Sequence, residues 1–114
     1  MGSNIDRKQA IREYKARKAP PRGIFAVRCT ATGQLWIASS MNLDAAQNSA
    51  WFSLRNGLYP NKSIQAEWNT HGDRAFVYEI LEKLEDDVSA IQINDVLKAK
   101  KRYWMDQLGA QTMT

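Results

Sequence analysis

The sequence predicts an α+β domain: a three-stranded, mainly antiparallel sheet with flanking helices, in the order α-β-β-α-α-β-α. Two kinds of periodicity lead to this prediction. Three short segments alternate apolar and polar residues as strands do, and four others repeat apolar residues at helical spacing. The chain has 114 residues, of which 44% are hydrophobic, so one domain can bury a real core. We place that domain at residues 23–114.

The first predicted element is a helix over residues 5–18. Asn4 is a suitable N-cap, and Pro20 and Pro21 end the helix because proline disfavours helical backbone at and before its own position. Its apolar stripe is thin. We therefore expect residues 1–22 to form a basic extension that lies on the domain or contacts a partner.

A β-hairpin is predicted next. Apolar residues alternate over residues 23–30 and again over 35–39, and Gly33 between them suits a turn that requires positive φ. A third alternating segment, residues 75–83, predicts the last strand of the sheet. The acidic residues 85–89 follow it as a loop.

Helical spacing marks three further segments, residues 43–56, 60–71 and 90–108. Asn42 is suited to cap the first of them, and Gly57 suits the left-handed position after its end. The last helix is expected to bury one face, made of Ile93, Leu97, Trp104 and Leu108.

The net charge of +4 is unevenly distributed: +5 over residues 1–22, −5 over 79–95 and +3 over 96–114. Basic clusters can neutralise phosphates, so nucleic acid is a candidate partner, although solvated helix faces have the same composition. The two clusters are Arg12, Lys15, Arg17 and Lys18 near one end, and Lys98, Lys100, Lys101 and Arg102 near the other.

Several classes of protein are excluded by what the sequence lacks. No apolar run is long enough to span a membrane and no signal peptide is recognisable, so we expect a cytoplasmic protein. Cys29 has no second cysteine for a disulfide, and with one histidine it does not complete a four-ligand zinc site. We predict no metal site, and for His71 a role as a helix cap or core residue.

One ordered string of short motifs is specific. Gly23-Ile24-Phe25, residues 35–40 and Asn42-Leu43 resemble the GIY-YIG nuclease superfamily, and Phe25 and Trp36 stand 11 positions apart, as its two motif tyrosines typically do. The resemblance covers residues 23–84, and the order of elements also matches. The chain is most similar to small stand-alone bacterial members with an added N-terminal helix.

The resemblance implies hydrolysis of a DNA phosphodiester with one divalent metal, such as Mg²⁺. In that family a tyrosine helps to activate the nucleophile, an arginine steadies the phosphate and a glutamate holds the metal. These roles require a hydroxyl that can lose its proton, a guanidinium group held in a fixed position and a carboxylate oxygen.

This sequence departs from the family at each of those positions. The tyrosines correspond to Phe25 and Trp36, the arginine to Ala46 and the metal-binding glutamate to Lys101, while a histidine found in some members corresponds to Tyr59. On a helical wheel Lys101 falls on the shoulder of the buried face. An ammonium there repels a divalent cation but can itself contact a phosphate.

Three hypotheses follow. The first is a catalytically inactive domain that acts as a nucleic-acid-binding or regulatory module. The second is a module that binds a small ligand or a protein partner in an apolar cleft formed by Phe25, Trp36 and Ala46. The third is an endonuclease with a non-standard site, and only this hypothesis requires a cofactor, Mg²⁺. Oligomeric state does not follow from the sequence.

Overall fold

The computed structural model describes residues 20–85 and 87–114. The helix predicted over residues 5–18 and its basic cluster lie outside the described residues, as does Asp86. The elements are β1 (Gly23–Cys29), β2 (Leu35–Ser40), α2 (Leu43–Arg55), α3 (Lys62–His71), the short 3₁₀ helix η1 (Asp73–Ala75), β3 (Phe76–Lys83), α4 (Ile93–Leu108) and β4 (Gln111–Thr112).

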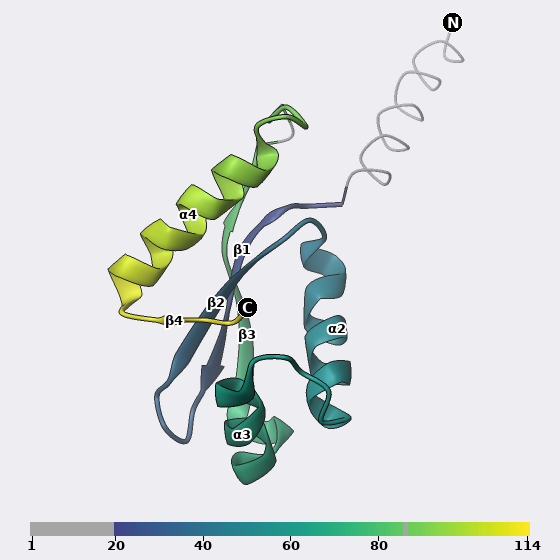
Figure 1. Ribbon diagram of the computed structural model, residues 1–114, viewed down its shortest axis with the longest axis vertical. Helices are drawn as coiled ribbons and strands as arrows, with labels where there is room; N and C mark the ends of the chain where they lie inside the picture. Colours follow the sequence, from purple (N-terminus) through teal and green to yellow (C-terminus); the bar gives the residue numbers. More distant parts are fainter. Residues whose placement is uncertain (1–19, 86) are drawn as a thin grey trace, which may run out of the picture.

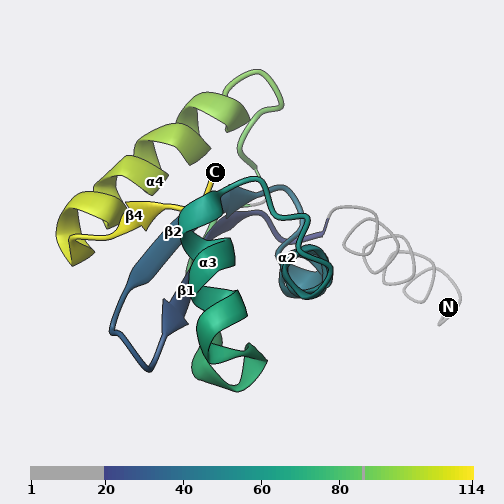
Figure 2. The same ribbon diagram turned by 60° about the horizontal axis from the view of Figure 1, so that its bottom comes forward.

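The four strands form one mixed sheet in the order β3-β1-β2-β4 (Figure 1). β1 is antiparallel to both β2 and β3, whereas β4 runs parallel to β2. Helices α2 and α3 lie on one side of the sheet and α4 lies on the other, as the turned view in Figure 2 also shows. The predicted α+β class and the order of its main elements are confirmed.

The two sides of the sheet have different cores. The side covered by α2 and α3 is rich in aromatic residues, which include Phe25, Trp36, Trp51, Trp68 and Phe76. The side covered by α4 is aliphatic and smaller, built from Ile24, Ala26, Ile37, Leu84, Ile93 and Leu97. Alternation along β1 sends successive side chains into one core and then the other.

The fourth strand corrects the prediction of three. β4 has two residues, too few to produce an alternating pattern, and its pairing with β2 is parallel. It is extended by Met113, whose backbone N–H donates to the carbonyl oxygen of Ile37 at 2.9 Å and whose side chain is fully buried. The C-terminal segment is therefore part of the core.

The last helix also differs from its prediction. α4 begins at Ile93 rather than residue 90, and Leu108, expected on the buried face, is 44% exposed. Trp104 is half-buried beside the edge strand β3, where its indole nitrogen donates to Glu82 Oε1 at 2.9 Å. Only the first half of α4 therefore packs deeply on the sheet.

The caps predicted for α2 are confirmed. Asn42 Oδ1 accepts a hydrogen bond from the backbone N–H of Ala45, and Gly57 has φ of +69° just beyond the C-terminal end. Within the described residues, no helix is both long and apolar enough to cross a bilayer.

Gly23 is required by a close approach of two strands. A β-carbon at this position would stand 1.9 Å from the carbonyl oxygen of Glu82 on β3. The register of β1 and β3 shifts just beyond it, between Ile24 and Phe25. The glycine that opens the first motif therefore has a structural reason: it lets β3 pass next to β1.

Candidate functional site

A hollow of about 210 Å³ opens where β1, β2, α2 and the C-terminal segment meet. Three of the five positions at which the sequence resemblance implies catalytic groups, Phe25, Ala46 and Tyr59, line it together. The remaining lining residues are mostly small and hydroxylated: Ala38, Ser39, Ser40, Ser49, Ala50, Ser53 and Thr114. The hollow therefore has a rim of hydroxyl groups around an apolar floor.

Phe25 forms part of that floor and is 5% exposed. Its ring lies 5.1 Å from the ring of Tyr78, whose hydroxyl donates to the carbonyl oxygen of Leu43 at 2.9 Å. Burial, aided by the negative charge of Asp44, raises the pKa of Tyr78. Neither ring offers a proton acceptor at neutral pH, since Phe25 has no hydroxyl and Tyr78 keeps its proton.

Tyr59 is the titratable residue in the lining of the hollow. Its backbone N–H donates to Gln65 Oε1 at 3.1 Å, and the buried Gln65 amide donates in turn to the carbonyl oxygen of Leu54 at 2.9 Å. These bonds fix the loop between α2 and α3. Burial raises the pKa of Tyr59, so its hydroxyl is a neutral hydrogen-bonding group at physiological pH.

Trp36 does not line the hollow. Its side chain is fully buried in the aromatic core and stacks on Phe76 at 6.2 Å between ring centroids. Among the described residues, its indole nitrogen is a buried side-chain atom with no hydrogen-bond partner. Of the three residues expected to form a cleft, Phe25 and Ala46 therefore line the same hollow, whereas Trp36 does not, because its large ring is packed against Phe76 inside the aromatic core.

Lys101 connects the hollow to the neighbouring surface of α4. Its ammonium donates to the hydroxyl oxygen of Thr114 at 2.8 Å, and Thr114 is part of the rim. Lys101 is half-buried, and this burial lowers its pKa from the ordinary value. A cation thus stands beside the hollow, on the helix where the resemblance implies a metal-binding carboxylate.

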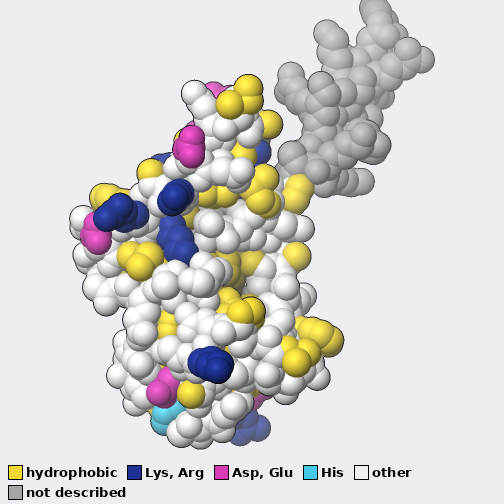
Figure 3. All heavy atoms as spheres, viewed as in Figure 1, with side chains coloured by type: hydrophobic (Ala, Val, Ile, Leu, Met, Phe, Trp, Pro, Cys, Tyr) yellow, Lys and Arg dark blue, Asp and Glu magenta, His cyan; other side chains and the backbone are white. Residues whose placement is uncertain are grey.

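We call the larger depression beside it, of about 540 Å³, the α4 groove. Its lining residues are Asp95, Lys98, Ala99, Lys101, Arg102, Met105 and Thr112. Figure 3 shows Lys and Arg side chains gathered over the part of the surface where α4 runs. Three of the four residues of the second predicted basic cluster thus share one groove, which adjoins the hollow at the contact between Lys101 and Thr114.

Lys100, the fourth member, lies elsewhere on α4 and pairs with Glu82 of β3. The hydrogen bond from Lys100 lowers the pKa of Glu82; burial opposes this shift, and the bond from Trp104 adds to it. The pair fixes α4 against the sheet edge. Lys100 is therefore committed to an intramolecular contact.

The serine rim and the pairing of Glu82 were not predicted from the sequence. Ser49 and Ser53 lie one helical turn apart on α2, and Ser39 and Ser40 end β2, so the spacing on α2 was a usable signal. The role of Thr114 had no signal, because it depends on how the C-terminal segment returns to β2.

Comparison with solved structures shows the same fold elsewhere. The chain is similar to a structure of the catalytic domain of homing endonuclease I-TevI, with a TM-score of 0.66 and 20% sequence identity over 77% of this chain and 88% of that one. A mutant of the catalytic domain of intron endonuclease I-TevI gives a TM-score of 0.69 and 17% identity over 82% and 94% of the two chains.

No protein-family model matches the sequence, and no curated protein matches it. At these identities the similarity establishes the fold. The chain has a GIY-YIG-like fold, and the expectation drawn from its motifs is confirmed at that level.

Proposed function

We propose that this chain is a GIY-YIG-like domain that binds nucleic acid and does not cleave it. One observation carries the proposal: the α4 groove, with Lys98, Lys101 and Arg102, adjoins the hollow formed by the positions that correspond to family catalytic groups. A phosphate backbone that follows the groove reaches the hollow without leaving the surface.

The binding part rests on charge and on size. The three cations of the groove are opposed by Asp95 alone among its lining residues, so the groove attracts a polyanion. The hollow, at about 210 Å³, is smaller than the roughly 300–1,000 Å³ typical of small-molecule sites. This size favours nucleic acid over a planar ligand that occupies the hollow alone.

The non-cleaving part rests on the missing chemistry. Phe25 has no proton to exchange, Ala46 has no guanidinium, and the raised pKa of Tyr59 keeps that hydroxyl neutral. None of the residues that line the hollow carries a carboxylate or an imidazole, and Lys101 supplies a cation beside it. The divalent metal of the family therefore does not fit these residues, and we derive no step through it.

The binding test is a fluorescence-anisotropy titration of the full chain with labelled duplex DNA, single-stranded DNA and RNA at several salt concentrations. We expect affinity to fall steeply with salt. The K98Q/K101Q/R102Q variant should bind at least about tenfold more weakly, and its salt slope should be flatter by about 0.9 for each phosphate that it no longer neutralises. R55Q/K62Q/R74Q is the charge-matched control: it removes three positive charges from exposed residues outside the groove and should bind nearly as the wild type does.

An affinity that does not change with salt concentration, or that is the same in the triple variant as in the wild type, would contradict the proposed interface. The basic cluster at Arg12, Lys15, Arg17 and Lys18 is tested separately by replacing all four with glutamine. We propose that it adds phosphate contacts, so this variant should also bind more weakly.

Cleavage is tested with supercoiled plasmid and branched DNA in Mg²⁺ or Mn²⁺. We expect no nicking at high protein concentration. Nicking that EDTA abolishes and that co-purifies with the chain would instead support a metal-dependent endonuclease with a non-standard site.

A further inference from the structure

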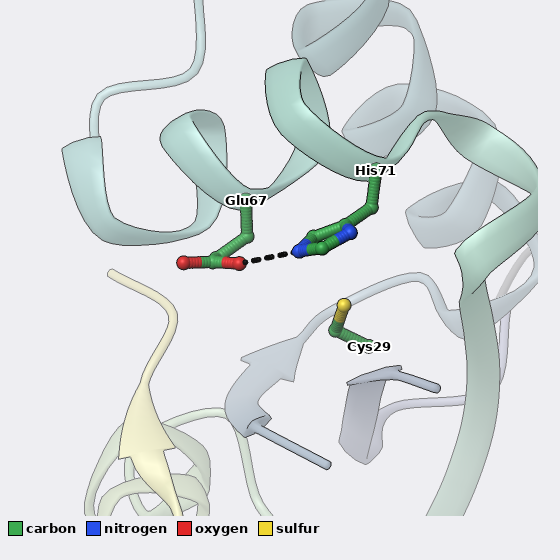
Figure 4. Close-up of side chains that lie close together, drawn as sticks. All are labelled: Cys29, Glu67 and His71. Carbon is green, nitrogen blue, oxygen red and sulfur yellow. Dashed lines mark ion pairs between the residues drawn. The ribbon is translucent and has the colours of Figure 1, made fainter. Parts of the chain in front are cut away.

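Three potential metal ligands meet at the end of β1 opposite the hollow. The thiol sulfur of Cys29, a carboxylate oxygen of Glu67 and a ring nitrogen of His71 all lie within 4.8 Å of one another. In Figure 4 the sulfur points toward the imidazole, and Glu67 lies beside it on the same helix. The prediction of no metal site counted the one cysteine and one histidine, and Glu67 adds a carboxylate to these two potential ligands.

The backbone holds Cys29 in place. Its N–H donates to the carbonyl oxygen of Gln34 at 2.9 Å, and its own carbonyl oxygen accepts from Gly33 at 2.8 Å, which closes the hairpin. The next residue, Thr30, donates from its N–H to the carbonyl oxygen of Ala75 at 2.7 Å. This bond ties the end of β1 to the segment that follows α3.

Helix α3, which carries the other two potential ligands, is held in place by the packing of Trp68. Trp68 is buried, with its ring 5.1 Å from Phe76 and 5.4 Å from Trp51. Glu67 and His71 stand one turn apart, so they project from the same side of α3. His71 Nε2 and Glu67 Oε2 lie 3.2 Å apart, which is an ion pair when the imidazole is protonated.

The donor set matches a recognisable class of metal site. Thiolate, imidazole and carboxylate are all zinc ligands, and sites with three protein ligands keep a fourth position for water. Tetrahedral bonds of about 2.0–2.3 Å bring the ligand atoms to within roughly 3.5 Å of each other, so side-chain movements of about 1 Å suffice. Cys29 is fully buried while Glu67 and His71 are partly accessible, which gives an ion a route from solvent.

We propose that Cys29, Glu67 and His71 form a three-ligand site for a divalent transition metal of the zinc class, with water as the fourth ligand. Binding requires a thiolate at Cys29 and an unprotonated ring nitrogen at His71, and any proton that these two atoms carry is released to solvent. The ion joins the end of β1 to the last turn of α3. The site is separate from the hollow and from the α4 groove, so the proposal of a metal site does not depend on the proposal of nucleic-acid binding.

The test begins with the full chain stripped of metal by a chelator, to which Zn²⁺ or Co²⁺ is added as the probe. We expect one ion per chain, a rise in Tm with Zn²⁺, and with Co²⁺ an intense thiolate-to-metal charge-transfer band together with the visible bands of a four-coordinate ion. Glu67→Gln and His71→Gln, both on partly exposed residues, should each lower the affinity by at least about 100-fold, beyond the 10–100-fold typical of outer-shell changes.

Asp73→Asn, a nearby exposed acidic residue on η1, is the matched control and should bind as the wild type does. Cys29→Ser should abolish the charge-transfer band; because this residue is buried, the Glu67 and His71 variants keep the test valid if the serine variant does not fold. The proposal is overturned if Co²⁺ binds without the charge-transfer band, if binding is not one to one, or if Glu67→Gln and His71→Gln leave it unchanged.

Discussion

The hydrophobic cores on the two sides of the sheet differ in size. Thirteen of the described residues form the core cluster between the sheet and helices α2 and α3, whereas six form the cluster on the α4 side. On α4 itself, only Ile93 and Leu97 are buried. The larger core buries more apolar residues, and the smaller core leaves most of the surface of α4 exposed, which is where the α4 groove lies.

The sharpest test of this comparison is one core truncation on each side. Trp68→Ala removes a ring that packs on both Phe76 and Trp51, and we expect a loss of about 3–5 kcal/mol in the free energy of unfolding. Leu97→Ala should cost about 2–3 kcal/mol. Urea denaturation followed by circular dichroism measures both. An equal or larger loss from Leu97→Ala would contradict this comparison.

The next effect concerns the contact between β1 and β3. Gly23→Ala places a β-carbon 1.9 Å from a backbone carbonyl oxygen, so the strands must separate, and we expect a cost of about 3 kcal/mol. The control is Gly33→Ala, which meets no atom within 4 Å and bears only the penalty of its left-handed φ, about 1 kcal/mol. Equal losses in urea denaturation would rule out the steric explanation.

The third effect is electrostatic and links β3 to α4. Because the folded-state pKa of Glu82 is lowered, its contribution to stability is fully present above the unfolded-state pKa of about 4.3 and is lost as pH falls through the folded value. Glu82→Gln should therefore cost about 1 kcal/mol at neutral pH, and the difference from wild type should vanish in acid.

Glu79→Gln is the matched change on the same strand. Glu79 pairs with Arg28 at 3.4 Å, and both side chains are more exposed, so we expect a loss below about 0.5 kcal/mol. Stability measured between about pH 2 and 7 separates the two variants. A constant deficit for Glu82→Gln across this range would contradict the ionic explanation.

An equally small effect on stability is expected at Lys101. Its ammonium is partly desolvated and has one hydrogen bond, to Thr114, so Lys101→Met should change the free energy of unfolding by no more than about 0.5 kcal/mol. The same change should reduce the salt slope of DNA binding by about 0.9, because one phosphate is no longer neutralised. Strong destabilisation without a change in binding would assign Lys101 to the core.

The sequence predicted well those features that depend on local pattern. The hairpin, α2 with its caps and the strand at β3 all follow from periodicity and capping residues, which act over a few positions. It predicted poorly those features that depend on tertiary contacts, such as β4 and the burial of α4. β4 is too short to carry a pattern. Trp104 lies at the sheet edge, where its indole bonds to Glu82, and Leu108 lies exposed beyond it.

The candidate site shows the same division. The motif positions led to Phe25, Ala46 and Tyr59, which line one hollow, but spacing alone did not show that Trp36 is enclosed in the core. Neither did it separate Lys100 from the other three basic residues, because the ion pair with Glu82 joins residues that are distant in sequence. The cluster of Cys29 with Glu67 and His71 likewise arises only when β1 meets α3.

The parallel pairing of β4 with β2 has a kinetic consequence. It joins Trp36 to Gln111, which are separated by most of the domain, and because closing a long loop costs entropy we expect this pairing to form late in folding. Thr112 lines the α4 groove and Thr114 lines the hollow, so both sites are completed only when this last strand docks. A brief local detachment of residues 111–114 removes a wall from each at once, and any ligand that spans the two holds the strand in place.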